Sequence, residues 1–277
     1  MLMPELPEVE TVKNVLKQHL INQTIEEVII YHEKMIKDIP VADFKKKLKN
    51  QKIIDIRRRG KYLVFHLEDY YLLSHLRMEG KFLYGKKNQH PNKHEHVVFT
   101  FDDGNALHYE DVRKFGTFHL FEKTLELESS KPFQVLGLEP FDEKFDETFV
   151  LDYIKNKKTP VKSMLLSQKM VTGLGNIYVD EVLFASRIHP QKKSNELSRD
   201  DVKNMVKYTR DILHQAILHK GTTIKTFTST HGTSGSFQDF LQVHTKTNQP
   251  CAVCGTTIKK IKLNGRGTYF CETCQNL

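Results

Sequence analysis

The sequence predicts an α+β protein in which an N-terminal helix and a β-sandwich or barrel precede a helical domain and a four-cysteine hairpin. Short strand-like runs fill the first half of the chain, helical periodicity replaces them from about residue 146, and all four cysteines lie between residues 251 and 274. Short strands at such spacing are typical of sandwiches and barrels. A length of 277 residues suits one large domain or two ordinary domains of ~150 residues.

Residues 5–20 are predicted to form the first helix. Val9, Val12, Leu16 and Leu20 make one apolar stripe, and a proline at position 7 is tolerated in a first turn. Asp103-Gly104 is a favourable hairpin turn between two of the strands that follow. The expected strands are 25–31, 53–57, 62–67, 71–75, 81–84, 97–101, 106–109 and 117–121.

The second half of the chain is predicted to be helical. Residues 137–145 contain glycine, proline and acids, and we expect them to be the interdomain linker. Ser198 and Asp201 resemble a capping box at the start of the longest helix. Residues 221–237 are rich in Gly, Ser and Thr, and long loops of this kind are often functional. The expected helices are 146–156, 160–168, 176–187 and 198–220; the expected domains are 1–136, 146–240 and 241–277.

The cysteines form two CxxC pairs, Cys251/Cys254 and Cys271/Cys274, with sixteen residues between them. In a reducing compartment this spacing indicates a tetrahedral zinc site. Four protein ligands leave no open coordination position, so the single zinc ion is expected to be structural. Two small disulfides are the alternative. The hairpin between the pairs has Asn264-Gly265 at its turn.

The formal net charge of +8 points weakly to an acidic partner. Residues 45–61 contain nine Lys/Arg and one acid, and residues 244–277 contain five Lys/Arg and one acid. Two such stretches can form one phosphate-binding surface, or they can simply be solvated faces. The chain has no apolar stretch near the ~20 residues of a spanning helix and no recognisable signal peptide. We therefore expect a cytoplasmic protein without a membrane association.

Several motifs together resemble the bacterial formamidopyrimidine-DNA glycosylases, the base-excision enzymes for oxidised purines. The resemblance covers nearly the whole chain and depends on the order in which the motifs occur. The motifs are Met3-Pro4-Glu5-Leu6-Pro7-Glu8-Val9-Glu10, Arg59-Gly60-Lys61-Tyr62, Ser74-His75-Leu76-Arg77-Met78-Glu79-Gly80, Asp111-Val112-Arg113-Lys114-Phe115-Gly116, Gly173-Leu174-Gly175-Asn176-Ile177-Tyr178-Val179-Asp180-Glu181 and the four-cysteine finger. The resemblance implies a β-sandwich, a helix–two-turn–helix element and a zinc finger.

The resemblance also implies a glycosylase with abasic-site lyase activity in the bacterial cytoplasm. Its nucleophile would be Pro4, because a terminal proline is a secondary amine that can displace a base and form a Schiff base. Glu5 would be the general acid and base, and Lys61 and Arg266 would hold phosphates and assist β- and δ-elimination. Glu8 would support the site or simply cap the helix.

Further DNA contacts follow from the same resemblance. Arg113 would face the orphaned base, normally cytosine, while Met78 and Phe115 enter the stack that the everted base leaves. Residues 221–237 would be the lid over that base. The remaining expected phosphate contacts are His94, Lys158, Lys162 and Asn176. The expected partner is double-stranded DNA with an oxidised purine, bound by a monomer.

The sequence departs from the family pattern in three places. Pro4 follows three residues, so its nitrogen is an amide unless translation starts at Met3 or the extension is removed. Ser167 stands where an acid is expected, and His244-Thr245-Lys246 where Tyr-Gly-Arg is expected. Two alternatives stay open: an endonuclease VIII-type enzyme for oxidised pyrimidines, and a non-catalytic binder of damaged DNA if Pro4 is never freed.

Overall fold

The computed structural model describes residues 3–87, 92–222 and 235–277. They divide into two units, which we describe separately. The first unit contains Met1–Gln134 and Lys220–Gly235, and the second contains Val135–His219 and Ser236–Leu277. Among the described residues, no helix has the length and apolar character needed to cross a membrane.

The first unit is a β-sandwich. Its four-stranded sheet has the order β1-β7-β8-β6, and its five-stranded sheet has the order β2-β9-β5-β4-β3. Among the described strands of this unit, the short pair β2 and β9 is parallel and the other pairs are antiparallel. The strands are β1 (Ile25–Ile30), β2 (Ile36–Lys37), β3 (Ile53–Arg59), β4 (Tyr62–Leu67), β5 (Tyr70–His75), β6 (Lys81–Lys86), β7 (Glu95–Phe101), β8 (Asn105–Glu110) and β9 (Thr117–Glu122).

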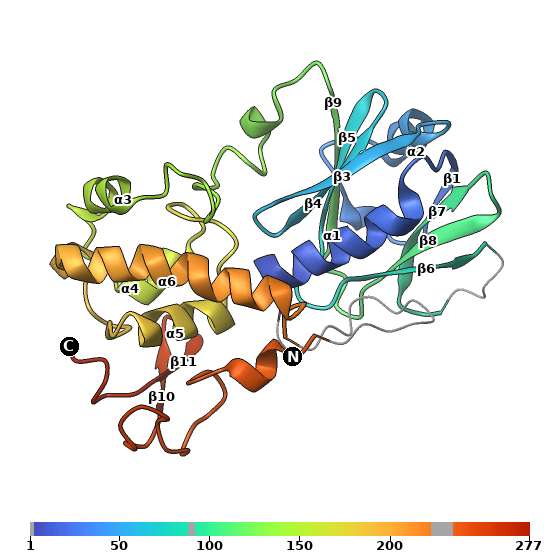
Figure 1. The fold of residues 1–277 in the computed structure, drawn as a ribbon. Helices are drawn as coiled ribbons and strands as arrows, with labels where there is room; N and C mark the ends of the chain where they lie inside the picture. The colour runs from blue at the N-terminus through green and yellow to red at the C-terminus, as the bar shows by residue number, and fades with distance from the viewer. Residues whose placement is uncertain (1–2, 88–91, 223–234) are drawn as a thin grey trace. The chain divides into compact units, whose positions relative to one another are not determined.

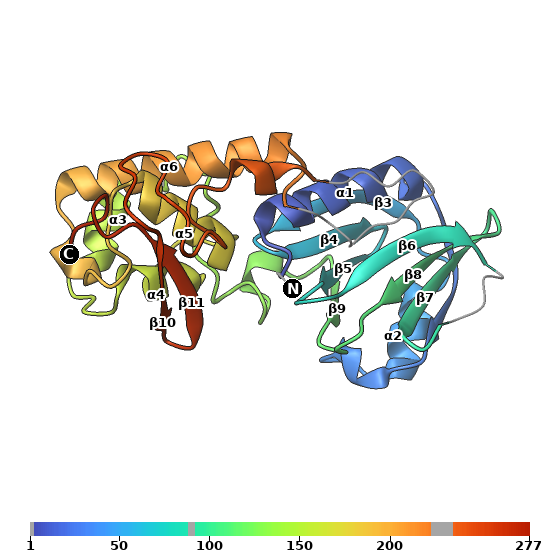
Figure 2. The ribbon, with the colours of Figure 1, turned by 90° about the horizontal axis from the view of Figure 1, so that it is seen from below.

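Helix α1 (Leu6–Leu20) lies along β3 and β4, as Figures 1 and 2 show. Its apolar stripe, Val9, Val12, Leu16 and Leu20, is at most 1% exposed and joins the core between the two sheets. The sequence predicted this helix and all eight main strands, because regular apolar spacing marks each of them. It missed β2 and the short helix α2 (Val41–Leu48).

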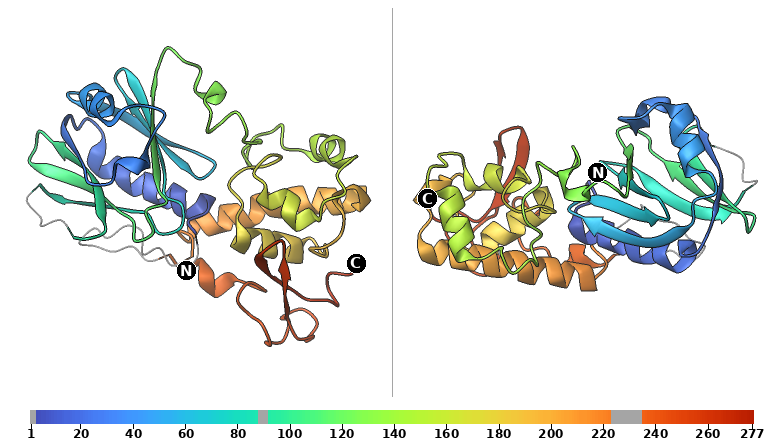
Figure 3. Two further views of the ribbon diagram at one scale, coloured as in Figure 1. Left: turned by 180° about the vertical axis from the view of Figure 1, so that it is seen from behind. Right: turned by 90° about the horizontal axis from the view of Figure 1, so that it is seen from above.

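The second unit packs helices around α5 (Asn176–Ala185), which is buried along most of its length. The long helix α6 (Arg199–Leu218) lies against α5 and against α3 (Glu147–Ile154), as two further views show (Figure 3). Ser198 and Asp201 form the predicted capping box, with Asp201 N–H donating to Ser198 Oγ at 3.1 Å. The fourth helix is α4 (Val161–Leu166).

The chain ends in a two-stranded hairpin of β10 (Lys259–Leu263) and β11 (Arg266–Phe270). Leu263 pairs with Arg266, so Asn264 and Gly265 form a two-residue turn, and both have a positive φ. This agrees with the turn predicted from Asn-Gly. The last residue of the loop expected at 221–237 instead begins a 3₁₀ helix (Phe237–Phe240). Residues 223–234 of the expected lid lie outside the described part of the chain.

Candidate active site and DNA-contacting residues

Two buried carboxylates lie at the start of α1, within four residues of Pro4. Pro4 is buried, and Glu5 and Glu8 are 2% and 4% exposed. Glu5 is the N-cap and forms a capping box with Glu8, whose Oε2 accepts a hydrogen bond from the Glu5 N–H at 2.9 Å. A carboxylate is stabilised at this end of a helix by the helix dipole. The expectation that Glu8 caps the helix is therefore consistent with the contacts.

The second oxygen of Glu8 holds the chain where the expected lid begins. Glu8 Oε1 accepts hydrogen bonds from the Thr222 N–H at 2.8 Å and the Thr222 hydroxyl at 3.2 Å. Gly221 has a φ of +75°, and a Cβ there would lie 2.5 Å from the same oxygen. Only glycine fits both the conformation and the space. One carboxylate therefore connects the start of α1 to the base of the 221–237 segment.

Lys61 lies in the tight turn between β3 and β4 and is 6% exposed. The neighbouring Arg58 donates to the Gly60 carbonyl at 3.0 Å and to Glu10 Oε2 on α1 at 2.9 Å. Burial raises the pKa of Glu10, but Lys13 and Arg58 outweigh burial and lower it below its ordinary value. This ion pair fastens the turn that carries Lys61 to the helix that follows Pro4.

The three residues expected to fill the DNA stack come from two loops of the first unit and lie together. Arg113 Nη1 lies 2.9 Å from Met78 Sδ, and its guanidinium lies 4.6 Å from the centre of the Phe115 ring. Phe115 is 50% exposed, which is unusual for a phenylalanine. Arg113 therefore contacts both Met78 and Phe115.

Asp111 organises the loop that carries Arg113 and Phe115. Its carboxylate is 1% exposed and accepts hydrogen bonds from the N–H groups of both residues at 2.9 Å and of Gly116 at 2.8 Å. A Cβ at Gly116 would lie 1.7 Å from the Tyr109 hydroxyl, so this position requires glycine.

The loop that carries Met78 is also held by a hydrogen bond to a buried side chain, that of His75. Arg77 N–H donates to His75 Nδ1 at 2.9 Å. Burial, with the nearby charges of Arg77 and Lys61, holds the pKa of His75 well below its ordinary value. The imidazole is therefore neutral and able to accept this bond. Sequence reasoning assigned no role to Asp111 or His75, although both belong to the quoted motifs.

Two further expected DNA contacts are accessible. His94 is half-buried, and its carbonyl accepts a hydrogen bond from the Asp111 N–H at 2.9 Å, so it adjoins the Arg113 loop. Lys158 is exposed in the segment between α3 and α4 of the second unit. Both side chains are therefore open to a ligand.

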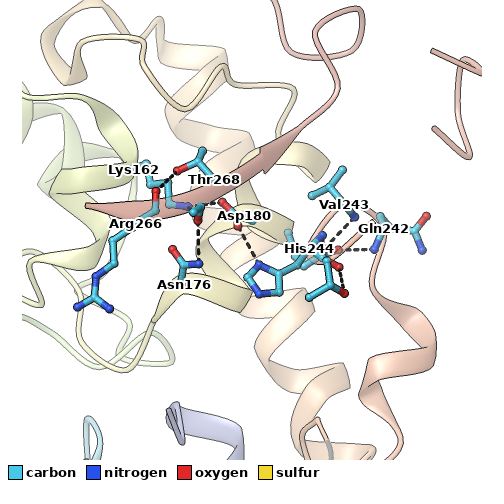
Figure 4. Close-up of polar contacts among 11 residues, drawn as sticks. Lys162, Asn176, Asp180, Gln242, Val243, His244, Arg266 and Thr268 are labelled. Atoms are coloured by element: carbon cyan, nitrogen blue, oxygen red, sulfur yellow. Dashed lines mark hydrogen bonds and ion pairs between the residues drawn. The ribbon is translucent and has the colours of Figure 1, made fainter. Parts of the chain in front are cut away.

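Arg266 is exposed at the start of β11, next to the hairpin turn (Figure 4). Asn176 begins α5, as predicted, and its Nδ2 donates to the Gly267 carbonyl at 2.9 Å. The phosphate contact expected of Lys162 is wrong. Lys162 is 1% exposed, and its ammonium donates to Asp180 Oδ1 at 2.6 Å and to the Gly267 carbonyl at 3.0 Å. The ammonium is thus occupied inside the protein.

The four cysteine sulfurs lie within 4.8 Å of one another, and all four cysteines are free thiols. The Cys254–Cys271 and Cys251–Cys274 sulfur pairs are 3.4 and 3.9 Å apart. Tetrahedral zinc with Zn–S bonds of about 2.3 Å needs sulfurs about 3.8 Å apart, so the cluster fits this ion. Burial and the neighbouring thiols raise the pKa of Cys274 to about 12. A cation at the centre would oppose that shift by favouring thiolates.

Comparisons with known proteins agree with this arrangement along the whole chain. Three family models match: the formamidopyrimidine-DNA glycosylase N-terminal domain over residues 3–118, the H2TH domain of the same enzymes over 136–228, and the zinc finger found in FPG and IleRS over 248–277. A curated formamidopyrimidine-DNA glycosylase of Mycoplasma mobile is 47% identical over 276 residues, covering 99% of this chain and 100% of the relative.

Solved structures with the same fold contain DNA. A Lactococcus lactis FPG mutant in complex with DNA containing Fapy-dG is 39% identical, with a TM-score of 0.92. The wild-type Lactococcus lactis protein in complex with DNA containing an oxidised pyrimidine is also 39% identical, with a TM-score of 0.90. Each comparison covers 99% of this chain and 100% of the other. Because the relatives match over their full length and the three family models cover most of the residues, this chain belongs to the formamidopyrimidine-DNA glycosylase family.

Proposed function

We propose that this chain removes oxidised purines, 8-oxoguanine and formamidopyrimidines, from double-stranded DNA opposite cytosine and then cleaves the abasic strand. The observation that carries the proposal is that Pro4 directly precedes the N-cap of α1, where Glu5 and Glu8 are both buried. The chain also matches a curated member of this family over the full length of that relative. We expect the protein to act as a monomer in the bacterial cytoplasm.

Base removal would start with attack by the Pro4 nitrogen on the sugar C1′. The bond from C1′ to the base breaks, and its electron pair leaves with the base. Once the attacking nitrogen has lost its proton, Glu5 would protonate the ring oxygen, so that the sugar opens and leaves an iminium on Pro4. This step requires removal of the residues before Pro4, since an amide nitrogen has no available electron pair.

Strand cleavage would follow from the iminium. The iminium acidifies the C2′ proton, and loss of this proton expels the 3′ phosphate by β-elimination. A second elimination expels the 5′ phosphate, and water then releases Pro4. We assign Lys61 to the phosphate beside the lesion and Arg266 to the flanking phosphates and the second elimination, because a guanidinium matches phosphate oxygens in a bidentate manner.

The other DNA contacts have separate tasks in this proposal. Met78, Arg113 and Phe115 fill the space left by the everted base, and Arg113 faces the opposite cytosine. His94, Lys158 and Asn176 bind backbone phosphates, which fix the register of the DNA without reading its sequence. One structural Zn²⁺ on Cys251, Cys254, Cys271 and Cys274 holds the hairpin that carries Arg266.

A panel of duplexes tests the proposal. We expect single-turnover cleavage of 8-oxoguanine and formamidopyrimidine duplexes to be much faster than cleavage of an oxidised-pyrimidine duplex, with no cleavage of intact DNA. Pro4→Gly, which after processing replaces the secondary amine by a primary amine, tests how far the reaction depends on the proline nitrogen. Faster cleavage of the oxidised pyrimidine would instead support an endonuclease VIII-type preference, a possibility raised by the pyrimidine-containing complex of the Lactococcus lactis relative.

A further inference from the structure

Three charged or polar side chains of the second unit form a buried network. Lys162, Asp180 and His244 are each 1% exposed. Asp180 Oδ1 accepts from Lys162 Nζ at 2.6 Å, and Asp180 Oδ2 accepts from His244 Nδ1 at 2.8 Å (Figure 4). Both carboxylate oxygens therefore have a donor. The network joins α4, α5 and the segment that leads into the cysteine hairpin.

The network ends at the carbonyl of Gly267, the residue that follows Arg266. The Gly267 carbonyl accepts hydrogen bonds from Lys162 Nζ at 3.0 Å and from Asn176 Nδ2 at 2.9 Å. On the other side of Arg266, the Asn264 amide donates to Ser163 Oγ on α4 at 2.7 Å. Residues on both sides of the exposed arginine are therefore held by α4 and α5, although they are about a hundred residues away in sequence.

A second carboxylate of α5 fixes the other end of the hairpin. Glu181 accepts hydrogen bonds from three consecutive N–H groups, those of Gln242 at 2.7 Å, Val243 at 3.0 Å and His244 at 2.8 Å. Burial raises the pKa of Glu181, while these three N–H groups oppose the shift. Adjacent acids on one helix thus hold the segment entering the cysteine hairpin and, through Lys162, the turn at its far end.

Such a network is better suited to fixing geometry than to adding stability. Removing charges from water offsets most of the attraction between buried partners, so buried ion pairs are weak evidence for stabilisation. Satisfied buried networks do restrict the number of arrangements that a structure can adopt. The arrangement restricted here is that of Arg266 relative to Asn176, two residues to which the proposed function assigns phosphates.

We infer that Lys162, Asp180 and His244 are positioning residues that set Arg266 for the second elimination. The inference rests on the proposed function. The network acts on Arg266 through the Gly267 peptide and touches no substrate itself. Its loss should therefore leave Schiff-base formation and β-elimination, which use residues of the first unit, close to normal, while conversion of the β product to the δ product slows.

The test uses the full-length zinc-loaded protein with Asp180→Asn and Lys162→Met. We expect the ratio of δ to β product in single turnovers to fall ten- to hundredfold, which is the usual effect of a misplaced catalytic group, while borohydride trapping and zinc content stay within about twofold of wild type. Lys192→Met is the matched control, because Lys192 also pairs with an aspartate, Asp201, at 2.8 Å. This control should leave the ratio unchanged.

Two further measurements separate positioning from general damage. In an Arg266→Ala background, Asp180→Asn should have no additional effect on the product ratio, because the two changes remove the same contribution. His244→Gln, whose amide can donate to Asp180, should retain more δ product than His244→Phe. The two His244 variants still test the inference if Asp180→Asn fails to fold.

The possible results are distinct. An unchanged product ratio in zinc-loaded Asp180→Asn and Lys162→Met would overturn the inference, and so would an equal loss of trapping and δ product, which indicates general structural damage. If the wild-type protein neither traps nor cleaves lesion DNA, the proposed function fails instead.

Discussion

At the scale of single residues, Glu8 shows how one side chain serves two parts of the molecule. Its two oxygens accept hydrogen bonds from the Glu5 N–H and from Thr222, which lies more than two hundred residues further along the chain. The sequence alone indicated a capping acid, because the spacing from Glu5 to Glu8 is local. The contact with Thr222 could not be predicted, since no local pattern reports which distant backbone meets a side chain.

Glu8→Gln should slow base removal more than it slows processing of an abasic site. Glutamine has one acceptor oxygen, so one N–H group loses its partner, at a cost of about 1–3 kcal/mol. If the 221–237 segment covers the damaged base, the loss matters only when a base is present. Single-turnover rates on 8-oxoguanine DNA and on abasic DNA measure this difference.

Asp146→Asn is the control for the Glu8 experiment. Asp146 belongs to the second unit, where it caps α3 by accepting a hydrogen bond from the Phe149 N–H at 2.8 Å. It should lower stability without separating the two rates. Equal slowing of both substrates by Glu8→Gln would contradict a role in the lid.

At the scale of elements, the loops that carry Met78 and Arg113 are held by buried hydrogen-bond acceptors, His75 and Asp111. Residues 77 and 114, each directly before an expected stack-filling residue, have φ values of +55° and +58°. Non-glycine residues rarely adopt this conformation, and it persists where surrounding contacts over-determine it. The bonds to His75 and Asp111 supply such contacts. The sequence identified the exposed residues of these loops. It did not predict that His75 and Asp111 accept the hydrogen bonds that hold the loops.

Asp111→Asn should weaken discrimination between opposite bases in the same way as Arg113→Ala. Arg113→Ala removes the side chain that faces the base and should lose discrimination of about 1–3 kcal/mol. Asparagine has a single acceptor oxygen where Asp111 uses two, so the loop loses its geometry and a similar part of the discrimination. Cleavage with each of the four bases opposite 8-oxoguanine gives the values.

The double variant Asp111→Asn/Arg113→Ala shows whether Asp111 acts through Arg113. If Asp111 acts through Arg113, the two effects should not add. Asp103→Asn, in the turn between β7 and β8, is the control, because Asp103 also accepts a backbone N–H, that of Asn105 at 2.9 Å. Additive losses, or an unchanged ranking of the four bases, would exclude the proposed positioning.

The cysteine hairpin is an element with little core of its own. Its buried apolar cluster consists of Phe184, Val243, Cys251, Ile258 and Cys271. Such a small cluster buries little apolar surface, and finger-sized zinc sites are commonly unfolded when the metal is absent. We expect Cys254→Ala, or removal of zinc by a chelator, to abolish DNA binding before the β-sandwich unfolds. Full DNA affinity in metal-free protein would refute this.

At the scale of the whole molecule, the sequence predicted the order of helices, strands and finger because apolar periodicity and turn residues are local signals. Helix α2 was missed because it has only eight residues, so its apolar positions, Val41, Phe44 and Leu48, are too few to stand out in a lysine-rich segment. The phosphate contact was assigned to Lys162 for a different reason. A lysine in a basic segment resembles a phosphate contact until its partner, eighteen residues away on another helix, is known.

The stability of the first unit should depend on histidine protonation. Burial lowers the pKa of His75 well below its ordinary value, and that of His66 to about 4. The unfolded chain then binds more protons than the folded one below pH 6.5, so stability is complete above that pH and is lost as the pH falls. For His75 the loss approaches about 1.4 kcal/mol per pH unit.

Urea unfolding between pH 7.5 and 5.0 checks the dependence on histidine. The free energy of unfolding should fall over this range in the wild type and fall less steeply in His75→Gln, whose amide oxygen can still accept the Arg77 N–H. An identical slope in both proteins would show that His75 is not responsible.

The central claim is that the nitrogen of Pro4 is the nucleophile, and covalent trapping tests it most directly. Borohydride is added while protein that begins at Pro4 reacts with 8-oxoguanine DNA, and the trapped species is digested and sequenced by mass spectrometry. We predict a reduced DNA adduct on Pro4, formed also by Lys61→Ala, and none in protein that retains the preceding residues. An adduct on a lysine, or efficient cleavage by correctly processed protein without any trapped species, would contradict the account.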